Sequence, residues 1–358
     1  MNIKSLLVVS FLLVHSLAWA QTVVLPYQPG VTTEGVTYYL PKTRLNILVQ
    51  ASCTTQYPGE LHSYASRFLR LTDVTNKKQI KWNIDKITVI PQGIPDTTKV
   101  FSIPLKKATI APLVSLSSDG LILSINTAAE EEHMPDMSPQ ESHKSNQLNS
   151  KDYLSQEILY AGSVAKMAEL TANEIYELRE SRTALSKGES DNLPKDGEQL
   201  KLMIQQLSLQ EEALLQLFKG YQEDMNKTFH LSFLPEKNIK KDILFRFSDQ
   251  SGVVSVNDLS GEPIYIDITD CKTLPSEVFD GKKKKTEEQA VRYNITSEVS
   301  VKIYSRNKVY CELTTPLPQF GRTEVLSNEL FNKRQSTQVL FNQQTGTLKK
   351  ITDESIDK

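Results

Sequence analysis

The first third of the chain, residues 21–127, has the alternation of apolar and polar positions that is typical of β-strands. The clearest strand patterns are residues 36–40, 44–49, 81–87 and 121–125. Pro41 lies between the first two patterns and indicates a turn. Apolar residues recur at helical spacing from Leu61 to Leu69. We therefore predict an N-terminal β-rich domain over 21–127 with one short helix.

Two heptad patterns predict long helices in the middle of the chain. The first is mostly alanine and comprises Leu154, Ile158, Ala161, Ala165, Ala168, Ala172 and Ile175. The second comprises Leu200, Met203, Leu207, Gln210, Leu214, Leu217 and Tyr221. Gly188 and Pro194 indicate the end of one helix and the start of the next. The short connection predicts an antiparallel helical hairpin over 152–228, and the alternative is an alanine seam that closes a coiled-coil dimer.

The segments on either side of these helices differ from each other. Residues 128–151 contain acidic and small polar side chains with almost no large apolar ones, which predicts a flexible acidic and polar linker. Residues 229–358 return to strand patterns and predict a C-terminal β-rich domain. The fold class that we expect is α+β, with two β-rich domains and a long antiparallel helical hairpin between them.

The N-terminal twenty residues have the pattern of a cleavable signal peptide. Lys4 precedes an apolar run, and Ala18 and Ala20 are the small residues that a signal peptidase requires. The alternative is a membrane anchor, but the apolar run is shorter than the roughly 20 residues that span a bilayer. We expect an exported chain whose mature part, after Ala20, has no membrane span. We expect it in the periplasm, with the periphery of the outer membrane or the extracellular side as alternatives.

Charge and cysteine content limit the partners and the redox chemistry that we expect. The chain has 41 basic and 43 acidic residues, a balance too even to favour nucleic acid as a partner. Cys53, Cys271 and Cys311 are an odd set for an oxidising compartment. Cys271 and Cys311 both lie in the C-terminal β-rich part, so one expectation is a disulfide between them. The alternative is three buried thiols.

Few of the residue patterns that catalysis or metal binding requires occur in the sequence. His133 and His143 lie in the acidic linker but lack a recognised ligand spacing, and Ser163 lacks the flanking glycines of a GxSxG motif. We therefore predict no catalytic residue, no metal site and no cofactor. A hydrolase built on two distant carboxylates stays open, because only their separation in space would identify it.

The densest polar cluster lies where the two predicted helices meet. Arg179 and Arg182 occupy positions of the first heptad seam, and Glu180, Glu189 and Asp191 are close to them in sequence. Arginines on a packing seam need carboxylate partners or water, because an unpaired buried charge costs several kcal/mol. One interpretation is a salt-bridge network that closes the tip of the hairpin. The other is a binding surface at which these five residues dock a partner.

Five segments carry a resemblance to a known family: Tyr39–Leu45, Tyr64–Leu69, Ile94–Val100, Ala161–Leu170 and Asn192–Glu198. With them, the chain resembles a family of exported Bacteroidetes proteins that share domain of unknown function 4831. The resemblance implies the envelope of a Gram-negative anaerobe and brings no activity or catalytic residue with it. Within one segment, Asp96-Thr97-Thr98 is similar to the O-glycosylation acceptor pattern of such exported proteins, so Thr97 is a candidate modification site.

The function that we expect is that of a non-enzymatic binding or scaffolding protein of the envelope. The hairpin would serve as a spacer or docking arm for a protein partner, an envelope protein of unknown identity. The alternative is a glycan-binding or carbohydrate-active protein. Its motivation is the same lineage together with Trp82 and 13 tyrosines, which provide stacking surfaces for sugars if they are exposed.

Overall fold

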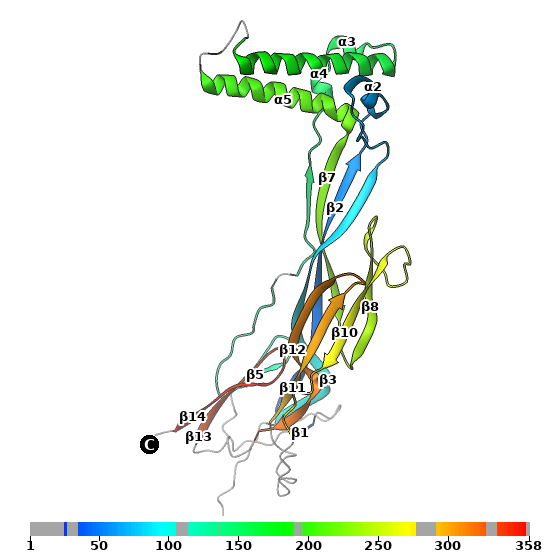
Figure 1. Ribbon diagram of the computed structural model, residues 1–358. Coiled ribbons are helices and arrows are strands. Elements are labelled where there is room, and N and C mark those ends of the chain that lie inside the picture. Colours follow the sequence, from blue (N-terminus) through cyan, green and yellow to red (C-terminus); the bar gives the residue numbers. More distant parts are fainter. Residues whose placement is uncertain are drawn as a thin grey trace, which may run out of the picture.

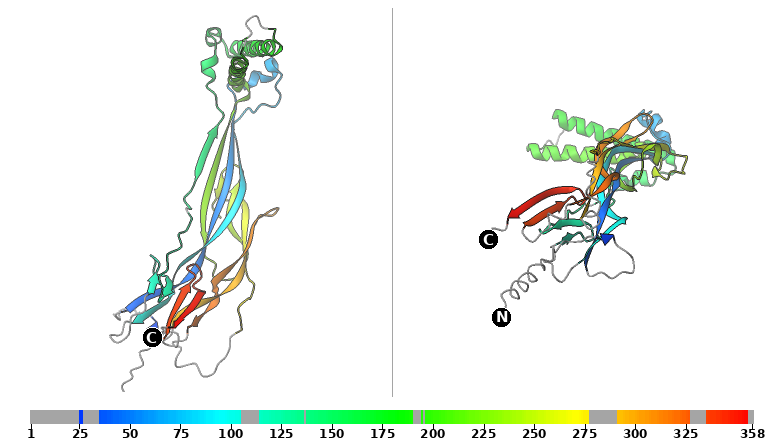
Figure 2. Two further views of the ribbon diagram at one scale, coloured as in Figure 1. Left: turned by 90° about the vertical axis from the view of Figure 1, so that its left-hand side faces the viewer. Right: turned by 90° about the horizontal axis from the view of Figure 1, so that it is seen from below.

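A computed structural model of the chain describes residues 25–26, 35–104, 114–135, 137–189, 194, 196–276, 291–326 and 335–355. The molecule is elongated, with strands gathered at one end and helices held at the other end of a long ribbon of strands (Figure 1). A view turned by 90° about the vertical axis shows the same separation (Figure 2, left). We call the helical end the head, and it comprises residues 61–69 and 150–219.

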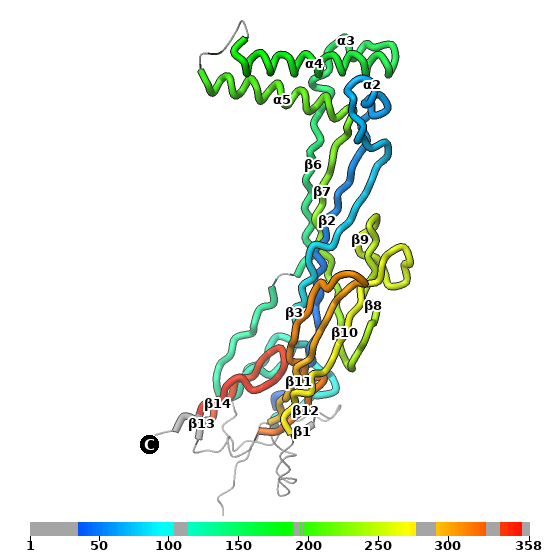
Figure 3. The backbone as a smooth tube through the Cα atoms, in the orientation of Figure 1, coloured from blue at the N-terminus to red at the C-terminus, as the bar shows by residue number. Residues whose placement is uncertain are grey.

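The ribbon is a five-stranded sheet in the order β1-β3-β2-β7-β6, which we call the long sheet. Its strands are β1 (Leu25–Pro26), β2 (Gly35–Tyr57), β3 (Gln79–Pro104), β6 (Glu141–Ser145) and β7 (Tyr221–Phe233). β2 and β3 are antiparallel partners along nearly their whole length. At about 3.3 Å per residue, the 23 residues of β2 extend about 75 Å. β7 pairs with the half of β2 nearer the head, and β6 follows β7 toward the head (Figure 3).

A second sheet covers one face of the long sheet. Its order is β12-β11-β10-β8-β9. Its strands are β8 (Ile239–Ser248), β9 (Gly252–Val254), β10 (Glu262–Asp270), β11 (Arg292–Tyr304) and β12 (Val309–Val325). Alternate residues of β2, such as Leu45, Ile47 and Val49, point to the same face and are fully buried. They share one hydrophobic core with inward residues of the second sheet, including Ile266 and Val301.

A third sheet pairs strands of residues 114–125 with strands near the C-terminus. Its order is β14-β13-β5-β4. Its strands are β4 (Val114–Leu116), β5 (Ile122–Ile125), β13 (Gln335–Phe341) and β14 (Leu348–Ser355). β5 pairs with β13 through Ile125↔Val339. The core beside this sheet also contains Tyr38 of β2, whose buried hydroxyl accepts a hydrogen bond from the Arg292 backbone N–H. Burial raises the pKa of Tyr38 above its ordinary value.

All three sheets meet at Asn294 on β11. Its fully buried side-chain amide donates to the carbonyl oxygens of Pro41 and Thr345, each at 2.9 Å. Gly346 lies beside it with φ +71°, and a Cβ added there would lie 2.6 Å from Cδ of Pro41. Glycine alone fits this position without strain. One side chain therefore connects β2, β11 and the turn between β13 and β14.

The head contains four α-helices and two 3-10 turns within the described residues. They are η1 (His62–Tyr64), α2 (Ala65–Leu69), η2 (Ser150–Tyr153), α3 (Gln156–Leu159), α4 (Val164–Lys187) and α5 (Gly197–Lys219). α4 begins after Ser163, whose Oγ accepts from the Lys166 N–H, and Gly188 ends it in the left-handed conformation. The seam alanines Ala168 and Ala172 are buried in a core that includes residues of α2 and α5.

The head joins the long sheet through a tight neck at Gly59 and Gly220. A Cβ added to Gly220, at φ +81°, would lie only 1.8 Å from the Tyr57 carbonyl oxygen. A Cβ on Gly59 would lie 2.3 Å from the Leu217 carbonyl oxygen. The rings of Tyr57 and Tyr221 stack at 4.7 Å, and the two residues pair in the ladder. The close backbone contacts show that the head is fixed to the sheet and not held on a loose linker.

The fold class predicted from the sequence is wrong. The chain is β-rich, with 49% strand and 23% helix, and is organised on three sheets. Strands from the two predicted β-rich domains share sheets, as β5 and β13 do. No long antiparallel helical hairpin separates two β domains; the helices lie at one end of the long sheet (Figure 1). Heptad spacing identifies helices locally, whereas the partner of a strand depends on the whole chain.

Two smaller predictions also differ from the structure. Pro41 does not form a turn but lies inside β2, opposite Pro95, next to an irregularity in the pairing of β2 with β3. Proline is tolerated there because a bulge leaves backbone groups unpaired. Part of the predicted flexible linker forms β6, which pairs with β7.

The predicted signal peptide, residues 1–20, lies outside the described residues. Among those that are described, no helix combines the length and apolar character needed to cross a membrane.

Candidate functional site

The two arginines predicted at the binding surface have a partner inside the head. Nε of Arg179 lies 2.7 Å from Oε1 of Glu211, and Nη1 of Arg182 lies 2.5 Å from Oε2 of the same carboxylate. Glu211 is on α5 and is 7% exposed. Two guanidinium groups thus neutralise one nearly buried carboxylate and connect α4 to α5. This is the salt-bridge interpretation of these residues, although both arginine side chains remain about one-third exposed.

The other residues of the predicted surface do not join this ion pair. Glu180 is exposed on α4, and Glu189 is exposed just after the end of the helix. Asp191 lies outside the described residues. The structure therefore places Arg179 and Arg182 together with Glu211, a residue that the sequence analysis did not select. A binding role for the predicted set stays a prediction.

An exposed apolar segment lies where α3 meets α4. Leu159 is 60% exposed, Tyr160 78% and Val164 57%. The local reason is the short helix α3, which buries Ile158 and ends at Leu159, so that the next side chain points away from the core. Ser163 then starts α4 in a new direction. We call Leu159, Tyr160 and Val164 the apolar segment of the head.

Further exposed apolar side chains lie elsewhere on the head. They are Tyr176 on α4 and the adjacent Leu202 and Met203 on α5. The head thus holds six of the eleven exposed large apolar side chains of the described chain. The sequence contained a signal for the apolar segment, because Leu159 and Tyr160 are apolar and lie off the heptad seam. Apolar residues off a seam face away from the partner helix.

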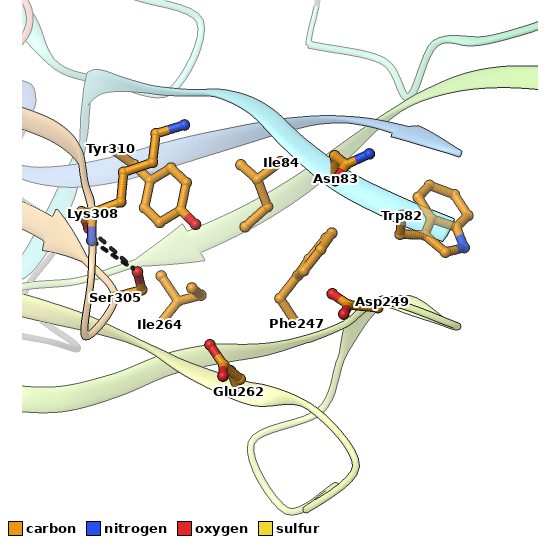
Figure 4. A pocket seen from close by; sticks show the side chains of 10 residues that line it. All are labelled: Trp82, Asn83, Ile84, Phe247, Asp249, Glu262, Ile264, Ser305, Lys308 and Tyr310. Carbon is orange, nitrogen blue, oxygen red and sulfur yellow. Dashed lines mark hydrogen bonds between the residues drawn. The ribbon is translucent and has the colours of Figure 1, made fainter. Parts of the chain in front are cut away.

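A second candidate site is a groove of about 260 Å³ between the long sheet and the second sheet (Figure 4). Its lining residues are Trp82, Asn83, Ile84, Phe247, Asp249, Glu262, Ile264, Ser305, Lys308 and Tyr310. They come from β3, the β8–β9 region, β10, and the turn between β11 and β12 with the start of β12. Trp82, Phe247 and Ile264 are buried and belong to the core beneath the groove.

The polar side chains of this groove are at its rim. Asn83, Asp249 and Glu262 are exposed, and in the described part of the chain none of their side chains has a hydrogen-bond or ion-pair partner. Lys308 Nζ lies 4.9 Å from the centre of the Tyr310 ring, a cation–π contact. The groove was not predicted, because its residues come from four separate parts of the sequence.

The backbone around the groove is held firmly. The Trp82 N–H donates to the Asp249 carbonyl oxygen at 2.7 Å, which connects the two sheets beside the groove. In the turn after β11, the Ser305 N–H donates to the Lys308 carbonyl oxygen at 2.8 Å. The Lys308 N–H donates to Oγ of Ser305 at 3.2 Å. These bonds fix the positions from which Asp249, Lys308 and Tyr310 extend.

The structure does not bring together the two cysteines of the predicted disulfide, and both Cys271 and Cys311 are free thiols in it. Cys311 pairs with Ile303 of β11, while the Cys271 N–H bonds to Glu298, five positions away on that strand. At about 3.3 Å per residue, that offset alone is roughly 17 Å, well beyond the reach of a disulfide of about 7 Å between Cα atoms. Cys53 is buried, whereas Cys271 is exposed, so three buried thiols do not describe the chain either.

Thr97 lies in an accessible part of β3. Tyr39 pairs with Val100 and Pro41 with Pro95, so residues 96–99 bulge out opposite one residue of β2. The Asp96 carboxylate accepts hydrogen bonds from the N–H and the hydroxyl of Thr98, and the Thr97 side chain is exposed. Modification of Thr97 stays a prediction.

The linker histidines do not assemble a metal site in the part of the chain that is described. Nε2 of His143 on β6 lies 2.8 Å from a Glu141 oxygen, and both side chains are exposed. No group of three or more His, Cys, Asp or Glu side chains with ligand geometry occurs among the described residues. Glu141 also pairs with Lys227 of β7, and this hydrogen bond holds the pKa of Glu141 below its ordinary value.

Comparison with known proteins identifies a family for nearly the whole chain. Neither the curated proteins nor the solved structures give a match. The family described as "Domain of unknown function (DUF4831)" matches residues 34–349, which include the head, the whole second sheet, the long sheet apart from β1 and the third sheet apart from most of β14. The chain therefore belongs to the DUF4831 family.

Proposed function

We propose that this chain is an exported binding protein of the cell envelope that docks a protein partner through the apolar segment of its head. The observation that carries the proposal is the position of Leu159, Tyr160 and Val164. These three neighbouring side chains are each more than half exposed. They lie at the end of α3 and the start of α4, and these helices are at the end of the molecule farthest from the third sheet (Figure 1).

The chemistry of the segment suits protein recognition. Aromatic residues are enriched among the side chains that contribute most to protein–protein binding, and burial of Tyr160 with Leu159 and Val164 would remove exposed apolar surface from water. The partner that fits is a protein with an apolar pocket for Tyr160 and Leu159. Arg179 and Arg182 need not provide the docking energy, because Glu211 already engages both.

The geometry of the neck supports the same role. Because the glycines of the neck allow direct backbone contact, the head keeps a defined orientation on the long sheet. A surface held in one orientation loses less conformational entropy when it binds than a surface on a flexible arm. The long sheet then acts as a spacer that separates the docking end from the sheets at the other end.

Photo-crosslinking in intact cells tests the proposal. A photoreactive amino acid is placed at Tyr160 in the full-length chain, and the matched control carries it at Glu180, an exposed residue of the predicted tip surface. We expect one dominant envelope protein to be captured from position 160 and not from position 180. Capture from position 180 alone would instead support the tip surface and overturn the apolar segment as the docking site.

Substitution of the same segment gives a second measure. The double variant Leu159→Ser, Tyr160→Ser should reduce recovery of the captured protein at least tenfold, since loss of a buried aromatic anchor costs about 2 kcal/mol or more. The control is Leu259→Ser, an 81% exposed leucine far from the head. Equal recovery with the double variant and the control would contradict docking through the apolar segment.

Glycan binding is the alternative function predicted from the sequence, and the apolar segment of the head is not the site that we assign to it. The structural feature that bears on it is the groove between the long sheet and the second sheet.

A further inference from the structure

We propose that the groove between the long sheet and the second sheet binds an uncharged sugar ring. This inference goes beyond docking by the head, because it concerns other residues, another ligand and another part of the molecule. It depends on the shape of the groove, the apolar side chains beneath it and the unpartnered polar side chains around it.

Apolar side chains of the core lie beneath the groove, whereas most of the surface that the groove exposes is polar. Ile84, Phe247 and Ile264 point toward its centre from β3, β8 and β10 (Figure 4). Phe247 and Ile264 are more than nine-tenths buried, so the groove exposes only a shallow apolar surface. A sugar ring has the matching character, because its C–H groups form an apolar face while its hydroxyls project around the edge. Small-molecule sites combine an apolar lining with a few placed polar groups in the same way.

The rim offers hydrogen-bonding groups where the hydroxyls of such a ring would lie. The Tyr310 hydroxyl points into the groove, and the carboxylates of Asp249 and Glu262 lie along another side (Figure 4). None of these three groups has a hydrogen-bond partner among the described residues. Carboxylates accept hydrogen bonds from hydroxyl donors, and such charge-assisted bonds are stronger than neutral ones. The phenol both donates and accepts, so it suits either role of a sugar hydroxyl.

The charge of the rim selects against acidic ligands. Two carboxylates, Asp249 and Glu262, face one ammonium group, and Lys308 already packs over the Tyr310 ring. A uronic acid or another anion would bring its charge close to two like charges, which is unfavourable in a partly desolvated groove. The ligand class that fits is therefore a neutral sugar and not an acidic one.

The groove is formed before any ligand arrives. Its residues extend from strands of two packed sheets, and the Trp82–Asp249 backbone hydrogen bond fixes the two sheets relative to each other. Gly252 lets the chain pass close to the Trp82 ring, since a Cβ there would lie only 3.1 Å from the indole. Sites on rigid elements hold their side chains more accurately than sites on loops. Binding need not order a flexible segment first.

Isothermal titration calorimetry of the purified protein tests the proposal with defined probes. The probes are cellotriose, mannotriose and chitotriose as neutral sugars, and trigalacturonate as the acidic one. We expect saturable binding of at least one neutral trisaccharide and at least tenfold weaker binding of trigalacturonate. Absence of binding by all three neutral probes, or equal affinity for trigalacturonate, would overturn the inference.

Conservative variants then assign the binding to the groove. Asp249→Asn, Glu262→Gln and Tyr310→Phe each remove a charge or a hydroxyl without changing side-chain size, and each should weaken neutral-sugar binding about tenfold. The matched control is Glu236→Gln, an exposed carboxylate in the turn between β7 and β8. Unchanged affinity in all three groove variants would place the sugar elsewhere and overturn the assignment. The head variant Tyr160→Ser should keep sugar binding, which separates this result from that of the docking experiment.

Discussion

Single side-chain amides connect sheets whose strands are far apart in the sequence. Nε2 of Gln319, on β12, donates to the Thr43 carbonyl oxygen at 2.6 Å, and its Oε1 accepts from the Thr43 N–H at 3.1 Å. Asn294 makes the corresponding contacts where all three sheets meet. Replacing either amide side chain with an apolar one would leave backbone groups without a hydrogen-bond partner. Each unpaired buried group would lower the free energy of unfolding by about 1–3 kcal/mol. The junctions between sheets are therefore specified by a few polar side chains as well as by apolar packing.

The three cysteines differ in their surroundings, and their reactivity should differ accordingly. Cys271 is exposed, Cys53 is buried, and Cys311 is partly buried. Burial raises the pKa of the Cys311 thiol, so less of the reactive thiolate is present near neutral pH. We expect a thiol reagent to label Cys271 first, Cys311 more slowly and faster as the pH rises, and Cys53 only after unfolding.

Mass spectrometry of peptides from timed labelling reactions measures this order without any substitution. In the protein that has been unfolded without a reducing agent, the reagent should label all three cysteines. If Cys271 and Cys311 stayed unlabelled under these conditions, a disulfide would join them. Labelling of Cys53 at the rate of Cys271 would contradict the packing of β2.

Individual functional residues were only partly predictable from the sequence. Charge on a heptad seam correctly indicated that Arg179 and Arg182 need a carboxylate or water. It did not indicate Glu211, because Glu211 lies off the second heptad seam, beside Gln210, and the sequence does not show which carboxylate of the partner helix faces the arginines. Tyr160 was placed beside a seam position and not recognised as exposed. Its exposure results from the end of α3, and helix ends are poorly defined by periodicity.

At the scale of elements, the contact between α4 and α5 depends on Glu211. Glu211→Gln would retain the size of the side chain but remove the charge that faces Arg179 and Arg182. We expect it to destabilise the head by about 1–3 kcal/mol, since hydrogen bonds to charged groups contribute that much and water reaches part of both arginines. Faster hydrogen–deuterium exchange of the amides in α4 and α5 would measure the loss.

The neighbouring residue provides the control. Glu212 is exposed on the same helix, so Glu212→Gln makes the same chemical change outside the contact. Its exchange rates should stay at those of the unchanged protein. If the two variants behave alike, the ion pair does not stabilise the contact between α4 and α5.

Sequence patterns found the strands more reliably than their lengths and partners. The alternation around Leu45, Ile47 and Val49 correctly indicated a strand with one buried face. Two predicted strands, 36–40 and 44–49, are instead parts of the single strand β2. Proline was interpreted as a boundary, but an irregular pairing at Pro41 accommodates it. The five-residue strand β6 carries polar side chains on both faces, so no apolar alternation distinguished it from a linker.

At the scale of the whole molecule, the separation of head and sheets should be visible in solution. A compact chain of 358 residues would have a radius of gyration of about 20 Å. Because β2 alone extends about 75 Å, small-angle scattering should give a clearly larger radius and a maximum dimension above that length. A radius near the compact value would mean that the head folds back onto the sheets, contrary to the extended arrangement.

The overall arrangement could not be predicted from local patterns. Tyr57 of β2 pairs with Tyr221 of β7, more than 160 positions later, and Ile125 pairs with Val339 over a still longer separation. No turn signal connects such strands, so local patterns assigned strands that pair with each other to different predicted domains. Local spacing reports what an element is, while long-range pairing decides where it lies.

The order in which the strands leave the ribosome has a consequence for the unfinished chain. All of β2, β3, β6 and β7 and the whole head precede residue 234, so the long sheet has its main strands before the second sheet exists. Until β8 and β10–β12 are made, the face of β2 that carries Leu45, Ile47 and Val49 has no cover. An apolar sheet face of that length is a site for aggregation in a partly synthesised protein. A chaperone that covers this face until the second sheet forms would prevent such contacts with other chains.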